Sequence, residues 1–122
     1  MPRPVHFEIP ANDAKRAVKF FGDVFGWQSN EFGENSGYFL TTTGSEDDPG
    51  IHGAIMQRKH PEQPLTNSIS VDSIDNYAAK ITEAGGQIVV PKMVIPSAGY
   101  LAYFKDTEGN IHGLWQEDTS AA

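Results

Sequence analysis

His6 and Glu8, near the start of the chain, are the two residues whose types and spacing could do chemistry. They alternate with apolar residues over 5–9, as in a β-strand, and residues two apart on a strand share a face. A carboxylate near an imidazole raises the pKa of the ring and can orient it, which suits a general base. We therefore predict His6 and Glu8 as a catalytic pair. The alternative is that both only line a binding site and hydrogen-bond a ligand or ordered water.

The elements that must position this pair occur twice in the chain. In the first half, a strand at 5–9 is expected to end at Pro10. Apolar residues at spacings of three and four then predict a helix from Ala14 to a stop at Gly26. Three further strands are predicted at 27–32, 38–43 and 51–58. The second half repeats this order, with a strand at 66–71, a helix over 74–84 and strands at 87–95, 99–105 and 111–116.

The two halves coincide when one is shifted along the other. Gly86 lies 60 positions after Gly26, and Ile111-His112-Gly113 lies 60 positions after Ile51-His52-Gly53. We predict an α+β fold of two tandem β-α-β-β-β modules within a single domain over 1–122. The first module covers about 4–58, a linker 59–65, and the second module about 66–117. Together they are expected to form an open, incomplete barrel around a cleft, and concave clefts are where small ligands bind.

Strand alternation predicts which side chains of the second module line this cleft. Tyr103 is preferred to Tyr100, because its neighbours Ala102 and Phe104 have the character of core residues. A bare glycine at 113 leaves room for a flat ligand, and an aromatic wall at 115 could stack on it. The predicted ligand-binding residues are Thr66, Ser68, Tyr103, Ile111, Gly113 and Trp115.

Three stretches carry a resemblance to a known family. They are Asn12-Asp13 through Val24-Phe25-Gly26-Trp27, Ala84-Gly85-Gly86, and Phe104-Lys105-Asp106-Thr107-Glu108-Gly109-Asn110-Ile111. The last is similar to the family's Asp-Pro-Asp-Gly-Asn turn, with threonine in place of proline. With its doubled module, the chain resembles over about 4–117 the vicinal oxygen chelate superfamily, which contains glyoxalase I, bleomycin-resistance proteins and extradiol dioxygenases. The resemblance implies a homodimer, since members with chains this short usually dimerise.

The family's metal site is only partly represented in this chain. Metal-dependent members hold one divalent ion with four side chains, one from each first and last strand of the two modules. Carried over by position, the four ligands fall on His6, Gly53, Thr66 and Gly113. Glycine has no ligand atom, a neutral hydroxyl is a poor ligand, and a catalytic metal needs about three protein ligands. We therefore predict no metal ligands and no cofactor; the alternative is a divalent metal held by His6 with Glu8.

His52 and His112 correspond to each other in the repeat and leave two readings open. If they approached each other, two imidazoles together with His6 would suit zinc. Alternation opposes this, because it places His52 and His112 on the opposite face from Gly53 and Gly113. The other reading is a pair of polar residues under the helices or near the sheet edge, hydrogen-bonded to backbone.

Charge and composition exclude several classes of protein. The 122 residues hold 9 basic and 16 acidic side chains, for a net charge of −7, so nucleic acid and anionic membranes are not expected partners. The absence of cysteine excludes thiolate zinc sites, iron–sulfur clusters and cysteine nucleophiles. The first residues carry no apolar segment of a signal peptide, and a cytoplasmic protein is expected.

The expected function follows from a cleft that lacks its metal ligands. We expect a protein that binds a small, partly aromatic organic molecule between the modules, without a catalytic metal. The alternative is a lyase, isomerase or dioxygenase of the glyoxalase type that uses His6, as metal ligand or general base, with Glu8. A third possibility is a structural or partner-binding dimer whose cleft is vestigial.

Overall fold

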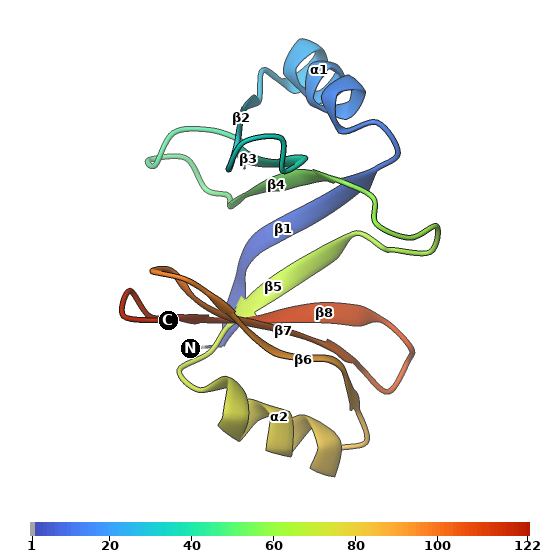
Figure 1. Ribbon diagram of the computed structural model, residues 1–122, viewed down its shortest axis with the longest axis vertical. Helices are drawn as coiled ribbons and strands as arrows, with labels where there is room; N and C mark the ends of the chain where they lie inside the picture. The colour runs from blue at the N-terminus through green and yellow to red at the C-terminus, as the bar shows by residue number, and fades with distance from the viewer. Residues whose placement is uncertain (1) are drawn as a thin grey trace. The chain divides into compact units, whose positions relative to one another are not determined.

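The computed structural model describes residues 2–122 of the chain. By its internal contacts the chain divides into two compact units. We call His6–Leu65 module 1, and Thr66–Ala122 together with residues 2–5 module 2. Each module contains one helix and a four-stranded sheet (Figure 1).

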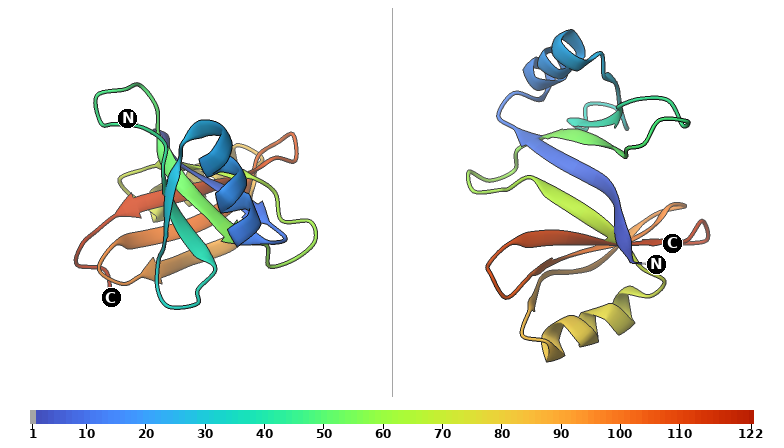
Figure 2. Two further views of the ribbon diagram at one scale, coloured as in Figure 1. Left: turned by 90° about the horizontal axis from the view of Figure 1, so that it is seen from above. Right: turned by 180° about the vertical axis from the view of Figure 1, so that it is seen from behind.

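Module 1 is built from the part of β1 (Arg3–Ala11) that begins at His6, followed by α1 (Ala14–Phe25), β2 (Gln28–Glu31), β3 (Tyr38–Thr42) and β4 (His52–Gln57). Its strands lie in the order β2-β3-β4-β1. β1 runs parallel to β4, and the other pairs are antiparallel. Figure 2 shows α1 beside this sheet, where it contacts β2, β3 and β4.

Local sequence signals define both ends of α1. The carboxylate of Asp13 accepts a hydrogen bond from the backbone N–H of Arg16 at 3.1 Å, which caps the first turn. At the other end Gly26 adopts a left-handed φ of 75° and its N–H donates to the carbonyl of Gly22. Phe21 stacks on Trp27 with ring centroids 5.0 Å apart, so Trp27 belongs to the packing around α1. The predicted helix is confirmed at both ends.

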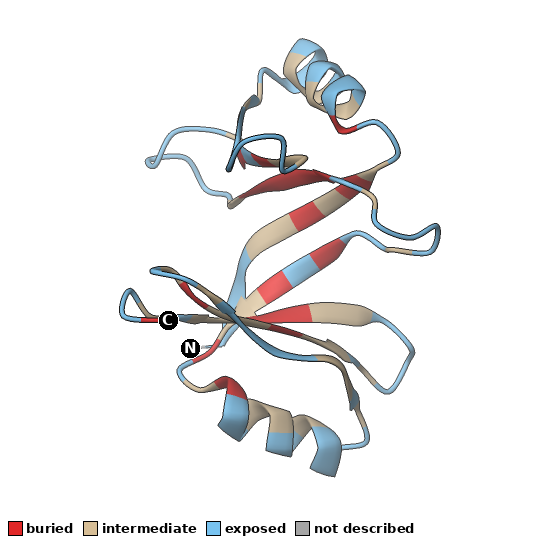
Figure 3. Ribbon diagram, in the orientation of Figure 1, coloured by how far each residue is buried: buried red, intermediate tan, exposed pale blue. Residues whose placement is uncertain are grey.

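Module 2 repeats the order with β5 (Thr66–Ser70), α2 (Ile74–Glu83), β6 (Gln87–Ile95), β7 (Gly99–Lys105) and β8 (Ile111–Glu117). The strands lie in the order β5-β8-β7-β6, with β5 parallel to β8. α2 contacts β6, β7 and β8. The core between them contains Val71, Ile74, Ala102 and Leu114, which lie among the buried residues of Figure 3.

The element order confirms the predicted β-α-β-β-β modules and the α+β fold with an open sheet. The expected end of the first strand at Pro10 was wrong. β1 continues to Ala11, with Pro10 beside Met56 and Ala11 beside Gln57. A proline is tolerated in a strand where the ladder needs no hydrogen bond from its nitrogen.

The number of sequence positions that separates equivalent residues of the two modules is not constant along the chain. Ala14 and Ile74, the first residues of α1 and α2, each donate a backbone N–H to a glutamine side chain, at 3.1 Å to Gln57 and 2.9 Å to Gln116. Ile74 follows Ala14 by 60 positions, but Gln116 follows Gln57 by only 59. The last strands are therefore equivalent at a shift of 59, although their Ile-His-Gly sequences match at 60.

This difference of one residue reverses the predicted face of every side chain on β4. Gly53 lies beside Phe7, and a Cβ on Gly53 would lie 2.5 Å from the Phe7 ring, which packs near Trp27 on the α1 side of the sheet. We expected Gly53 on the cleft face and His52 on the other, and that assignment was wrong. The residue that stands where module 2 has Gly113 is Ala54.

Candidate functional site

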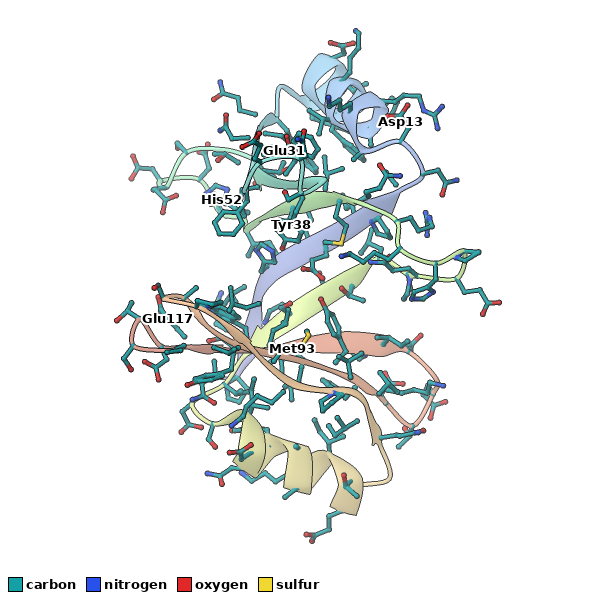
Figure 4. The ribbon with its side chains drawn as sticks, viewed as in Figure 1. Asp13, Glu31, Tyr38, His52, Met93 and Glu117 are labelled. Carbon is teal, nitrogen blue, oxygen red and sulfur yellow. The ribbon has the colours of Figure 1, made fainter. Side chains whose placement is uncertain are left out.

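On the face of the module 1 sheet that points away from α1, called here the open face, three polar side chains hydrogen-bond to one another. His6 and Glu8 alternate with Phe7, which packs on the α1 side, so both lie on the open face as predicted. Tyr38 lies beside Met56 across one strand pair, and Met56 lies beside Pro10 across the next. Since neighbours across a ladder share a face, Tyr38 belongs to the open face; Figure 4 shows it on the side of β4 away from α1.

Tyr38 joins the two predicted catalytic residues. Its hydroxyl donates to Oε2 of Glu8 at 2.9 Å and lies 3.1 Å from Nε2 of His6. The Glu8 side chain is buried, with 6% of the residue exposed, and His6 is half-buried. The phenol thus stands between a buried carboxylate and an imidazole, and the three residues form one hydrogen-bonded chain.

The direction of these hydrogen bonds sets the protonation of His6. Tyr38 gives its only proton to Glu8, so toward His6 its oxygen can only accept, and Nε2 of His6 is the donor. Burial lowers the pKa of His6 below its ordinary value of 6.5, and the negative charge of Glu8 opposes this only in part. A neutral ring with its proton on Nε2 carries a lone pair on Nδ1. His6 is therefore a hydrogen-bond acceptor at Nδ1. Glu8 acts to raise the pKa of His6, as expected, but burial has the larger effect and lowers it.

His52 and His112 each bind a carboxylate of the turn that precedes their own strand. Nε2 of His52 lies 2.9 Å from Glu46, while its Nδ1 accepts a hydrogen bond from the backbone N–H of Thr43. Nε2 of His112 lies 2.9 Å from Asp106, and its ring stacks on Phe104. The expectation of a backbone hydrogen bond is confirmed for His52. Both histidines hold a turn against a strand within their own module.

The open face of module 1 does not fit the metal site that the family implies. The imidazole of His6 and the carboxylate of Glu8 are both joined to Tyr38, and the residue beside Glu8 on β4 is Ala54. His52 is beside His6 across the ladder, but both of its ring nitrogens contact other groups. Within residues 2–122 no three His, Asp or Glu side chains gather where they could hold one ion. A catalytic metal needs about three protein ligands.

Asp106 has the most strongly perturbed carboxyl group of the described residues. The hydrogen bond from His112 is the main cause that lowers the pKa of Asp106 far below its usual range, and the backbone N–H groups of Asn110 and Glu108 add to it. These bonds close the turn from Asp106 to Asn110 between β7 and β8. The group acts as the anchor of that turn.

The six predicted ligand-binding residues of module 2 share one face of its sheet. Ser68 and Tyr103 both lie beside Gly113, and these positions alternate with Ala102 and Leu114 of the core. The full set on the face opposite α2 is Thr66, Ser68, Tyr103, Ile111, Gly113 and Trp115.

Two glycines of module 2 lie close to neighbouring side chains. A Cβ on Gly113 would lie 2.6 Å from Oγ of Ser68, so the missing side chain at this position accommodates Ser68. The Trp115 ring lies over Gly99, where an added Cβ would come within 2.9 Å of it. Glycine is required at both positions by a close approach of a neighbouring side chain.

Tyr38 is the residue of the site that sequence reasoning missed. The tyrosines weighed for the cleft were Tyr100 and Tyr103, and the alternation around Tyr38 does not by itself say which face it takes. The signal lies in the ladder: β3 beside β4, and β4 beside β1, brings Tyr38 next to His6 and Glu8. That register depends on the placement of β4, which the Ile-His-Gly match had misplaced by one residue.

The doubled β-α-β-β-β module with an open sheet places this chain in a class of small α+β proteins. A family model described as the Glyoxalase/Bleomycin resistance protein/Dioxygenase superfamily matches residues 3–112. The chain belongs to this superfamily.

Two relatives illustrate the similarity in sequence. A Mycobacterium tuberculosis protein described as "Putative glyoxylase CFP32" is 31% identical over 119 residues, which are 93% of this chain and 45% of the relative. A "Glyoxylase-like domain-containing protein" of Didymella fabae is 29% identical over 114 residues, which are 88% of each chain. This chain therefore spans less than half the length of its mycobacterial relative.

Solved structures agree on the fold. A methylmalonyl-CoA epimerase from Mycobacterium tuberculosis has a TM-score of 0.67 at 12% identity, covering 94% of this chain and 87% of that one. A methylmalonyl-CoA epimerase in complex with methylmalonyl-CoA and NH4+ has a TM-score of 0.69 at 13% identity, covering 100% and 99%. At this level of identity the likeness concerns the fold alone. No helix within residues 2–122 has the length and apolar character needed to cross a membrane.

Proposed function

We propose that this chain binds a small, partly aromatic organic molecule on the open face of module 1 and that binding needs no catalytic metal. The observation that carries the proposal is the chain from buried Glu8 through Tyr38 to His6. Burying a carboxylate costs free energy unless it is hydrogen-bonded, and a sheet face that served only as core would be filled more stably by apolar residues. A preformed polar group of this kind is typical of a ligand site. The six residues on the corresponding face of module 2 are predicted to make further contacts with the ligand.

A second function is favoured by the direction of the same hydrogen bonds. Nδ1 of His6 could take a proton from a substrate carbon, while Nε2 passes its proton to Tyr38 and Tyr38 passes its own to Glu8. The reverse transfer would return a proton to the carbon. This sequence is balanced without an oxidant or a metal, so it favours an isomerase over a lyase or dioxygenase. Two of the structural neighbours are named as epimerases, and an epimerase is an isomerase.

Binding is tested with a panel of single-ring organic compounds, read by thermal shift and tryptophan fluorescence. The expected result is a saturable shift for some compounds that is lost in His6→Ala and kept in His60→Ala, since His60 is an exposed residue outside the open face. A panel that shifts the protein equally in both variants would contradict the proposal.

The isomerase alternative has a separate readout. Compounds that bind are incubated with the protein in D2O, and exchange of a carbon-bound proton is followed by NMR. Exchange that disappears in His6→Ala and persists after chelation would make the second function the leading one. Binding without any exchange would leave the protein as a binding protein.

A further inference from the structure

We infer that the ligand of the open face is a hydrogen-bond donor without negative charge, such as a phenol or an aromatic amine, and that the site discriminates against carboxylates. This inference rests on the proposed function and deepens it by naming the chemical class of the ligand. It follows from the protonation of the three polar side chains and from the placement of the positive charges of module 1.

The open face presents acceptors to a ligand. Tyr38 donates its proton to Glu8, and His6 donates the proton on its Nε2 to Tyr38. In this hydrogen-bonded series a ligand can therefore engage Nδ1 of His6, which carries a lone pair. An acceptor of this kind selects a ligand O–H or N–H. A ligand that offers only acceptor atoms could form no hydrogen bond with Nδ1, because a lone pair of the ligand would face the lone pair of the ring.

No cation of module 1 lies on the open face to balance an anionic ligand. The five basic residues of His6–Leu65 are Lys15, Arg16 and Lys19 on α1 and Arg58 and Lys59 after β4. Arg58 donates to the carbonyls of Gln63 and Pro10 and to the side chain of Asn12, where it holds the end of β1. Arg3, at the start of β1, shares by alternation the face of Phe7, which is the α1 side of the sheet. The strands therefore supply no lysine or arginine to the open face.

The charge that does lie on this face is negative. Glu8 is buried among the strands, and a ligand carboxylate beside His6 would be a second negative charge close to it. Like charges brought together in a desolvated site disfavour binding strongly. Protonation of His6 would offset this, but its half-buried position disfavours the charged ring. His52, the other titratable group next to His6 across the ladder, already contacts Glu46.

The test compares three probes of one shape: 4-methylphenol, which has a donor; 4-methylanisole, which lacks it; and 4-methylbenzoate, which is an anion. We expect 4-methylphenol to bind about tenfold or more tightly than the other two. In Glu8→Gln, which keeps the size of the side chain and an acceptor for Tyr38, the discrimination against 4-methylbenzoate should shrink. In Glu34→Gln, which makes the same change of net charge at an exposed turn, it should not.

Each outcome decides between the two proposals. Binding of 4-methylbenzoate as tightly as 4-methylphenol, with both lost in His6→Ala, would overturn the inference while leaving the proposed function standing. Failure of every probe to bind would sink the proposed function and the inference with it. If Glu8→Gln does not fold, Tyr38→Phe provides the second variant: it should weaken 4-methylphenol relative to 4-methylanisole, because His6 is then no longer held as an acceptor at Nδ1. Unchanged relative affinity in that variant would count against the inference.

Discussion

The hydroxyl group of Tyr38 connects the polar side chains of the open face and sets their hydrogen-bonding roles. Tyr38 is both the donor that satisfies a buried carboxylate and the acceptor that fixes the tautomer of His6. Alternation along β1 is a local property, which is why the shared face of His6 and Glu8 was predictable from sequence. Their link through Tyr38 was not, because it depends on two neighbouring strand pairs.

Tyr38→Phe tests this role through stability. Removing the hydroxyl leaves Glu8 without one of its donors, and an unsatisfied buried group costs about 1–3 kcal/mol. We expect the free energy of unfolding in urea to fall by about that amount, and to fall by less when Glu8→Gln is already present. A loss of under about 0.5 kcal/mol, the size of an ordinary surface substitution, would contradict the hydrogen-bonded chain.

The lowered pKa of His6 predicts how stability changes with pH. The folded state disfavours the charged ring, so below pH 6.5 the unfolded chain binds a proton more readily than the folded protein. The contribution of His6 is therefore complete above 6.5 and is lost as the pH falls below 6.5 through the lower folded pKa. Unfolding free energies measured at several pH values from about 7.5 to about 5 should decrease more steeply in the wild type than in His6→Gln. The matched control is His60→Gln, which should follow the wild-type curve.

At the scale of single elements, the helices were predictable and the register of β4 was not. The Asp13 cap, the apolar spacing along α1 and the left-handed Gly26 all act within a few residues of one another. The face of β4 depends instead on its pairing with β1, and the match of Ile51-His52-Gly53 with Ile111-His112-Gly113 gave a shift that is wrong by one. Matching Gln57 with Gln116 instead gives the correct register of β4.

Gly53→Ala tests the register of β4. A Cβ at this position would lie 2.4 Å from the backbone oxygen of Phe7 and 2.5 Å from its ring, so the strands must shift to accept it. Overpacking of this kind costs about 1–3 kcal/mol, which urea unfolding would measure. At Gly44 the nearest atom to an added Cβ is 3.7 Å away, and Gly44→Ala should change stability by no more than about 0.5 kcal/mol. Equal tolerance of both substitutions would mean that Gly53 does not face Phe7.

At the scale of the whole molecule, the doubled architecture could be predicted from the repeat, since each module is defined by its own helix and strands. The chemistry could be predicted only in part. The shared face of His6 and Glu8 could be predicted from alternation. The close contacts of Gly113 with Ser68 and of the Trp115 ring with Gly99 could not, because alternation does not describe them.

Metal removal is the prediction that belongs to this scale. We expect that chelation leaves the thermal midpoint unchanged and that zinc, nickel, manganese and iron do not raise it, because a site that binds the folded state stabilises it as the metal concentration passes the dissociation constant. Elemental analysis of the purified protein provides the independent check. A stoichiometric metal that is lost in His6→Ala would overturn the proposal of metal-free binding.

The glutamine contacts at the starts of α1 and α2 have a consequence for how the chain folds. Each joins a helix to the last strand of its module, across 43 positions for Gln57 and 42 for Gln116. Such distant pairings close long loops, and proteins dominated by them fold on the order of milliseconds to seconds. During synthesis, α1 would emerge long before β4, with the N–H of Ala14 bound only to water. Closure of each module would then be a late event, set by the arrival of its final strand.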